Sequence, residues 1–160
     1  MAVKSSFPRW SALVACGGGA SRCAYGCTGC GACVSACKLG AIRLPEGGPA
    51  RVDADRCAAC GACVRACPQG IIRLHDRGNP IAVLCSNREK GALARERCGH
   101  SCIGCGLCQR ACGAGAIQVA EHRAVIDEAR CLGCGMCAVS CPRQVIRDLR
   151  GILTAGLSLK

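Results

Sequence analysis

One cysteine spacing, C-x2-C-x2-C-x3-C, occurs four times in this 160-residue chain and accounts for sixteen of its 20 cysteines. The second copy begins 30 residues after the first, the fourth begins 29 residues after the third, and the third begins 75 residues after the first. The repeated unit is therefore a pair of motifs. The copies are Cys27, Cys30, Cys33, Cys37; Cys57, Cys60, Cys63, Cys67; Cys102, Cys105, Cys108, Cys112; and Cys131, Cys134, Cys137, Cys141.

Thiolates two or three residues apart on a tight loop can all face one soft inorganic cluster, and this spacing is that of bacterial two-cluster ferredoxins. In that arrangement the fourth cysteine of each motif ligates the cluster of the other motif. We therefore predict four 4Fe-4S clusters. Their ligand sets are Cys27, Cys30, Cys33 with Cys67; Cys57, Cys60, Cys63 with Cys37; Cys102, Cys105, Cys108 with Cys141; and Cys131, Cys134, Cys137 with Cys112.

The residues that flank the cysteines agree with a cluster. A glycine follows the second cysteine of every copy, where the missing β-carbon lets backbone N–H groups approach cluster sulfurs. These glycines are Gly31, Gly61, Gly106 and Gly135. Proline follows the fourth cysteine in copies two and four, but Lys38 and Gly113 stand there in copies one and three. Paired C-x2-C hooks also bind zinc, so a zinc-bound interaction module is the competing interpretation, and the third cysteine of each copy argues against it.

Four further cysteines, Cys16, Cys23, Cys85 and Cys98, follow the same duplication. The segment Arg22-Cys23-x3-Cys27 matches Arg97-Cys98-x3-Cys102, and the apolar runs 12–16 and 81–85 each end in cysteine. Two interpretations remain open. These residues are buried structural thiols, or Cys23 and Cys98 serve as alternative ligands in place of a neighbouring motif cysteine.

Composition limits the fold. Phe, Trp and Tyr number only three in total, so the interior must be filled with small aliphatic side chains and cysteine. Domains of about 70 residues seldom reach comfortable stability without metals, disulfides or oligomerisation. We therefore expect an α+β fold of two tandem ferredoxin-like two-cluster modules, with short hairpins and short helices around the clusters. The expected divisions are an extension (1–11), a first module (12–76), an inter-module segment (77–97), a second module (98–150) and a tail (151–160).

Short β-like stretches lie between the motifs, so each module is predicted as strand, motif, hairpin, motif, strand. The hairpins should reverse at the loop 45–49 and at His122-Arg123. A polar segment from Ser86 to Arg97 is compatible with a short surface helix. The stretches are 41–44, 50–53, 71–74, 116–120, 124–127 and 145–148.

The formal charge of +11 needs no nucleic acid to explain it. Sixteen thiolates and four oxidised cluster cores would bring the net charge to roughly +3, because metal ligands must be deprotonated. A chain so poor in aromatic residues also lacks the stacking side chains that bind single strands. We therefore expect no nucleic-acid partner.

The sequence shows no constellation for converting an organic substrate. Neither G-x-G-x-x-G after a strand nor G-x4-G-K-[ST] is present, so no flavin or nucleotide site is expected. The histidines His75, His100 and His122 are scattered, and His100 is more typical of a surface or capping residue than of a cluster-tuning one. We predict no catalytic residues and an electron-carrier subunit; a reductase with its own flavin pocket is the alternative.

We expect no export signal at the N-terminus. The run Leu13 to Cys16 imitates a lipoprotein cleavage box, but no hydrophobic segment of about 7–15 residues precedes it. No window approaches the roughly 18 apolar residues of a membrane span. We expect a cytoplasmic protein that reaches a membrane only through partner subunits.

Several segments are more specific than the cysteine spacing. They are Cys23-x3-Cys27-x5-Cys33-x3-Cys37, Gly40-Ala41-Ile42, Cys67-Pro68, and a linker running from Cys85-Ser86-Asn87 through Lys90-Gly91-Ala92 and Arg97-Cys98 to Cys102-Ile103-Gly104-Cys105. Together they resemble the C-terminal polyferredoxin region of the B subunit of the Rnf-type ion-translocating electron transport complex. The resemblance extends from about residue 12 to residue 148.

The resemblance implies electron relay between reduced ferredoxin and NAD, with membrane and flavin subunits as partners. A free soluble polyferredoxin serving another redox enzyme is the alternative. Two departures stand out. Family members generally begin with a membrane-anchoring segment and a further iron-sulfur domain, so we expect this chain to be either a fragment or a detached soluble relative. Many members also lack a cysteine at the position of Cys30. In those members Cys23, Cys27 and Cys33 would contribute to the first cluster.

Overall fold

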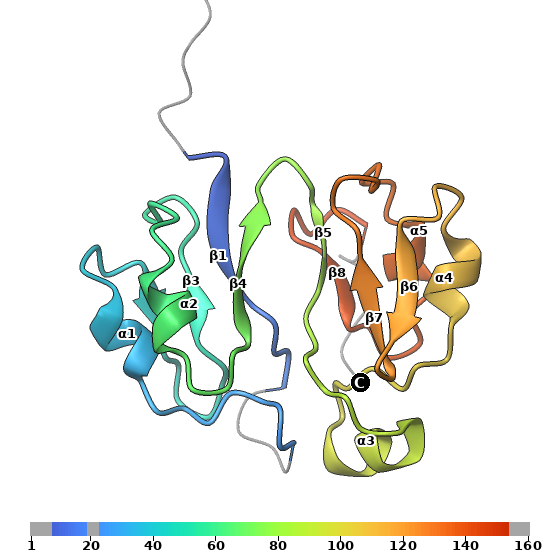
Figure 1. Ribbon diagram of the computed structural model, residues 1–160, viewed down its shortest axis with the longest axis horizontal. Helices are drawn as coiled ribbons and strands as arrows, with labels where there is room; N and C mark the ends of the chain where they lie inside the picture. The colour runs from blue at the N-terminus through green and yellow to red at the C-terminus, as the bar shows by residue number, and fades with distance from the viewer. Residues whose placement is uncertain (1–7, 19–22, 154–160) are drawn as a thin grey trace, which may run out of the picture.

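The computed structural model describes residues 8–18 and 23–153. Within them the chain forms two halves that lie side by side, the first drawn in blue to green and the second in yellow-green to red (Figure 1). The expected extension and tail, 1–11 and 151–160, fall largely outside the described residues.

The first half contains one sheet made by its outer strands and one hairpin. Antiparallel pairing places Trp10 opposite Asp76 and Val14 opposite Ile72, so the start of the half closes against its end. Its elements are β1 (Trp10–Val14), α1 (Ala32–Ala36), β2 (Ile42–Arg43), β3 (Arg51–Val52), α2 (Ala62–Ala66) and β4 (Ile72–Asp76).

The second half repeats this plan, with one added helix. Its outer strands pair with Ile81 opposite Asp148 and Val83 opposite Ile146, and its hairpin pairs Ile117 with Ile126. Its elements are β5 (Ile81–Val83), α3 (Gly91–Arg97), α4 (Leu107–Ala111), β6 (Ile117–Ala120), β7 (Arg123–Ile126), α5 (Met136–Val139) and β8 (Ile146–Asp148).

Four of the short helices begin directly after the glycine of a cysteine motif. That glycine has a φ of 73° to 76° in all four motifs, a left-handed conformation that glycine adopts without steric cost. The third cysteine lies inside the helix, and in α1, α2 and α4 the fourth cysteine is the residue at which the helix ends. The x3 spacing is thus one helical turn that holds two sulfurs.

Two separate cores form, one in each half. Both combine aliphatic side chains with the motif cysteines: Ile72, Cys33 and Cys63 are buried in the first, and Ile146, Cys108 and Cys137 in the second. In each half the two motif helices also pack together, α1 on α2 and α4 on α5. The cysteines therefore occupy the centre of each half, where larger apolar residues stand in ordinary domains.

The strands and hairpins follow the sequence-based expectations closely. Each predicted β-like stretch overlaps a strand. The second hairpin reverses at Glu121 and His122, whose φ values of 47° and 62° suit a tight turn, and not at His122-Arg123 as predicted, because Arg123 already pairs in β7. Strand β5 lies within the segment 77–97 and pairs with β8, because its apolar side chains complete the second core. The polar stretch 86–97 forms the expected short helix over its second half, as α3.

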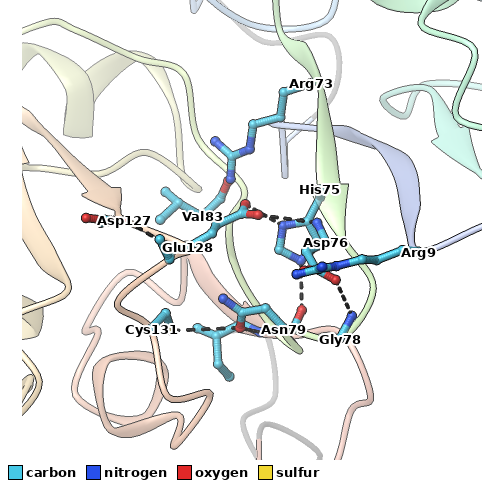
Figure 2. A network of polar contacts seen from close by, with 12 residues as sticks. Arg9, Arg73, His75, Asp76, Gly78, Asn79, Val83, Asp127, Glu128 and Cys131 are labelled. Carbon is cyan, nitrogen blue, oxygen red and sulfur yellow. Dashed lines mark hydrogen bonds and ion pairs between the residues drawn. The ribbon is translucent and has the colours of Figure 1, made fainter.

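A polar joint connects the two halves near β4 (Figure 2). The buried His75 ring donates from Nε2 to the Asn79 carbonyl at 2.8 Å, and its Nδ1 lies 2.7 Å from Glu128 Oε1. The second Glu128 oxygen accepts from the Asp76 amide at 3.3 Å, and the Arg73 guanidinium donates to the Val83 carbonyl at 3.3 Å. The two halves are therefore held together by charged and polar groups of β4 and the segment before the fourth motif.

None of the helices in the described ranges has the length and apolar character that a bilayer crossing needs.

Candidate iron-sulfur sites

Two hollows in the structure are lined by four cysteines each. The hollow of the first half is bordered by three cysteines of motif one and the last cysteine of motif two, together with Val14 and Ile72. The hollow of the second half is bordered in the same way by motif three and the end of motif four, together with Val119 and Ile146. The cysteines are Cys27, Cys30, Cys33 and Cys67 in the first, and Cys102, Cys105, Cys108 and Cys141 in the second.

In the first half, the cysteines whose charges affect one another fall into the same kind of group, three from one motif and the last from the other. Burial raises the pKa of the Cys33 thiol, and charge on Cys27 and on Cys67 raises it further. Burial likewise raises the pKa of Cys63, with added effects of charge on Cys57 and Cys37. Each buried thiol is thus close to cysteines of its own motif and to the last cysteine of the other motif.

The second half shows the same coupling more strongly. Burial raises the pKa of Cys108 to about 11, with further contributions from charge on Cys102 and Cys141. The pKa of Cys137 also rises to about 11, through burial and then charge on Cys131, among other cysteines that include Cys112. A thiol of this pKa is protonated at neutral pH, whereas a coordinated metal deprotonates it outright. A metal bound at these positions would therefore have to displace the thiol protons.

Exposure is graded along every motif. The second cysteine is exposed in all four copies, and the third is buried in all four. At the exposed Cys30, the Ala32 amide, followed by the Thr28 hydroxyl, lowers the pKa by hydrogen bonding. Each group of sulfurs therefore has one member inside the protein and one at the surface, which suits a redox group that exchanges electrons with a partner.

Backbone amides point at several of the motif sulfurs. The amides of Ala41 and Ala116 each donate to the fourth cysteine of the preceding motif, Cys37 and Cys112, at 3.3 Å. The amide of Ala12 donates to Cys57 Sγ at 3.4 Å. Such N–H···S contacts stabilise negative sulfur and are among the factors that set cluster potentials. The donors around these cysteines therefore fit an iron-sulfur cluster.

Two equivalent arginines connect the paired motifs. Arg56 precedes the second motif and donates to the Leu39 carbonyl at 3.1 Å, just after the end of the first motif. Arg130 precedes the fourth motif and donates to the Ala114 carbonyl at 3.3 Å, just after the third. These bonds hold the fourth cysteine of one motif near the start of the other and bring positive charge to the sulfur-rich region.

The four remaining cysteines lie together in a third hollow, a grouping that neither interpretation of the sequence predicted. Cys16, Cys23, Cys85 and Cys98 line it, along with His100. They are not among the residues that line the two motif hollows. The matching offsets of these cysteines in the two halves were the sequence signal that they belong to the duplication, but offsets alone do not show that the two halves meet at these residues.

The histidines lie in three different settings. His75 is buried in the joint between the halves, His100 borders the third hollow, and His122 is part of the β6–β7 turn. Across the described ranges, no three His, Cys, Asp or Glu side chains are gathered in the manner of a single-ion metal site.

Comparison with known proteins identifies the same repeats. The profile of a family described as "4Fe-4S dicluster domain" matches residues 26–71 and 101–145, and a second profile with that description matches residues 56–117. The first covers more than half of the chain. Its two matches coincide with the two pairs of motifs.

Two characterised relatives belong to oxidoreductase complexes. The chain is 45% identical over 112 residues to the B subunit of the proton-translocating ferredoxin:NAD(+) oxidoreductase complex of Clostridium ljungdahlii, an alignment that spans 70% of this chain and 39% of the relative. It is 41% identical over 81 residues to the B subunit of the Na(+)-translocating ferredoxin:NAD(+) oxidoreductase complex of Acetobacterium woodii, spanning 51% and 24%. The chain thus aligns with less than half the length of either relative.

Among solved structures, a formate dehydrogenase–heterodisulfide reductase–formylmethanofuran dehydrogenase complex from Methanospirillum hungatei matches at 20% identity, covering 76% of this chain and 51% of that one. The TM-score of 0.30 is too low to support an inference about fold.

Proposed function

Since this chain belongs to the family of 4Fe-4S dicluster domains, we propose that it relays single electrons through four 4Fe-4S clusters within a ferredoxin:NAD oxidoreductase complex. The observation that carries the proposal is the composition of the two motif hollows. Each combines three cysteines of one motif with the last cysteine of its partner, which is the ligand exchange of two-cluster ferredoxins.

The ligand sets we propose are those predicted from the spacing. Cys27, Cys30, Cys33 and Cys67 would hold one cluster, and Cys57, Cys60, Cys63 and Cys37 the second. In the other half, Cys102, Cys105, Cys108 and Cys141 would hold the third, and Cys131, Cys134, Cys137 and Cys112 the fourth. A bound cluster of this type accepts and releases one electron at a time.

The chain's own residues would set the environment of each proposed cluster. The buried third cysteine of each motif, with side chains such as Ile72 and Ile146, excludes water from one side of each site. The amides that donate to cysteine sulfur stabilise negative charge there, as at Cys37 and Cys112. The exposed second cysteine keeps the opposite side close to solvent, where a redox partner can approach.

The partners we propose are reduced ferredoxin and the membrane and flavin subunits of the complex. This follows from the names of the relatives and from the absence of a nucleotide-binding motif in the sequence. The chain would then work on the cytoplasmic face of the membrane, attached through those subunits, and would bind no flavin itself.

Metal analysis under anaerobic conditions tests the cofactor. The purified chain should be brown, with at least about 16 Fe and a similar amount of acid-labile sulfide. Reduced ferredoxin should bleach its visible absorbance, whereas NADH alone should not. A colourless protein that contains zinc and no sulfide would overturn the proposal.

Alkylation tests the exchange of ligands between motifs. In a Cys30→Ala/Cys33→Ala variant, the first cluster should be lost and its fourth ligand released. Iodoacetamide should then label Cys67, while Cys37 stays protected by the second cluster. Labelling of Cys37 with protection of Cys67 would show that each motif holds its own cluster instead.

A further inference from the structure

The third hollow brings together every cysteine that the four motifs do not use. Two of them come from the first half, Cys16 and Cys23, and two from the second, Cys85 and Cys98. Cys85 and Cys98 are buried, with 4% and 8% of their surface exposed. Cysteines scattered as inert core thiols would have no reason to meet at one place between two halves.

The outer strands deliver two of these sulfurs by the same geometry in both halves. In the first half the Ala15 amide donates to the Ile71 carbonyl at 2.8 Å, extending the β1–β4 pairing to the residue before Cys16. In the second half the Leu84 amide donates to the Val145 carbonyl at 2.7 Å, immediately before Cys85. The two cysteines are therefore equivalent ends of equivalent strands.

Both of these sulfurs also accept a backbone hydrogen bond from a motif cysteine. The Cys27 amide donates to Cys16 Sγ at 3.4 Å, and the Cys102 amide donates to Cys85 Sγ at 3.3 Å. These contacts are of the same kind and length as those at Cys37 and Cys112, which are proposed cluster ligands. An amide directed at sulfur favours the thiolate form that a metal requires.

The other two sulfurs lie close to the first pair. Burial raises the pKa of Cys23, and charge on Cys98 and then on Cys16 adds to it. A β-carbon added to Gly18 would lie 3.2 Å from Cys98 Sγ, so the turn after Cys16 lies directly against that sulfur. A side chain at this position would crowd the sulfur, so the small size of glycine favours this close approach of the backbone.

The walls of the hollow tie the two halves together. The Ser86 hydroxyl donates to the Ala15 carbonyl at 2.9 Å, across the boundary. The Arg143 guanidinium donates to the carbonyls of Cys98 and Gly99 at 3.0 and 2.6 Å, which holds the turn after Cys98 and brings a positive charge beside it. Arg143 also borders the motif hollow of the second half.

From these contacts we propose that Cys16, Cys23, Cys85 and Cys98 ligate a fifth 4Fe-4S cluster, located between the two halves. Four cysteines are the usual ligand set of such a cluster. The site differs from the other four because each half supplies two ligands. It adds to the four proposed clusters, and it does not depend on how the motif cysteines are shared.

Iron and sulfide content of the full chain, produced with iron-sulfur assembly and purified without oxygen, tests this inference. The wild type should contain about 20 Fe, and a Cys85→Ala/Cys98→Ala variant about 16. A Cys16→Ala/Cys23→Ala variant should lose the same four, and replacing all four cysteines should lose no more than either pair. This non-additivity separates a shared cluster from independent damage to each half.

The matched control is Ser86→Ala, which removes a contact between the halves at the same place but no sulfur, and it should retain about 20 Fe. Equal iron in the wild type and both double variants would overturn the inference and leave the four motif clusters standing. Loss of one zinc instead of iron, or an inter-half disulfide in the anaerobic wild type, would overturn it as well. A chain without any iron would refute the proposed function itself.

Discussion

The joint between the halves offers a quantitative test of how they are held. Glu128 is the shared acceptor for the buried His75 ring at 2.7 Å and for the Asp76 amide at 3.3 Å (Figure 2). The His75 side chain is 2% exposed and that of Glu128 is 25% exposed. Glu128→Ala would leave an imidazole nitrogen and an amide without an acceptor in a largely buried place.

Hydrogen bonds to charged groups contribute about 1.5–3 kcal/mol each when they are buried. The long amide contact and the partial exposure of Glu128 reduce the sum, and we expect a loss of about 2 kcal/mol. Local opening of the joint should then become roughly 30-fold more frequent, because about 1.4 kcal/mol corresponds to a factor of ten.

Hydrogen–deuterium exchange with mass spectrometry measures this opening in peptides that cover residues 74–84, in the cluster-loaded protein. Asp55→Ala is the control, because it removes a carboxylate that is 73% exposed and pairs with Arg77 at 2.6 Å. An exposed ion pair contributes at most about 1 kcal/mol, so exchange should rise less than about 5-fold. If Glu128→Ala exchanges no faster than Asp55→Ala, the assignment of the joint's stability to this carboxylate is wrong.

Two further predictions concern backbone conformation and pH. Gly31 has a φ of 74°, and a β-carbon there would meet no protein atom within 4 Å. Gly31→Ala should therefore destabilise the folded chain by about 1–2 kcal/mol through backbone strain alone, and Gly31→Asn by less, because Asn tolerates this conformation. Iron release to a chelator measures both, and equal rates would point to contact with the cluster rather than to strain. The amides of Leu153, then Arg150 and Ile152, lower the pKa of Asp148 from 3.8, so its stabilisation is present above 3.8 and lost as pH falls through the lower folded value. The hydrogen-exchange protection factors of the Ile152 and Leu153 amides, corrected for the intrinsic exchange rate at each pH, should therefore be constant from pH 8 to 5. They should drop in the Asp148→Asn variant. A decline in the wild type within that pH range would contradict the assignment.

Local features were predictable because a few residues determine them. The spacing of each motif places a glycine where the chain must turn, and the following x3 segment can only span one helical turn before the next cysteine. The two-residue reversal near His122 follows from alternating apolar residues on either side. Small aliphatic residues around cysteine likewise indicated a core built on clusters, and the family match supports iron-sulfur chemistry in the two motif pairs.

Contacts between the halves were not predictable. The pairing of His75 with Glu128 joins residues 53 positions apart, and neither residue belongs to a sequence motif. The segment 77–97 was expected to be a boundary, yet its strand β5 belongs to the second sheet and core. Polar composition indicates that a segment is exposed, but it does not show with which strand a nearby apolar run will pair.

The four cysteines outside the motifs show most clearly what the sequence determines and what only the tertiary structure determines. Sequence established that Cys16 and Cys85 end equivalent apolar runs and that Cys23 and Cys98 stand at equivalent offsets. Only the tertiary structure placed all four around one hollow, through the registers of β1 with β4 and of β5 with β8 and the contact of Ser86 with Ala15. Spacing along a chain fixes distances over a few residues. The contact between two halves depends on strand register and on the packing between them, and neither can be derived from one segment alone.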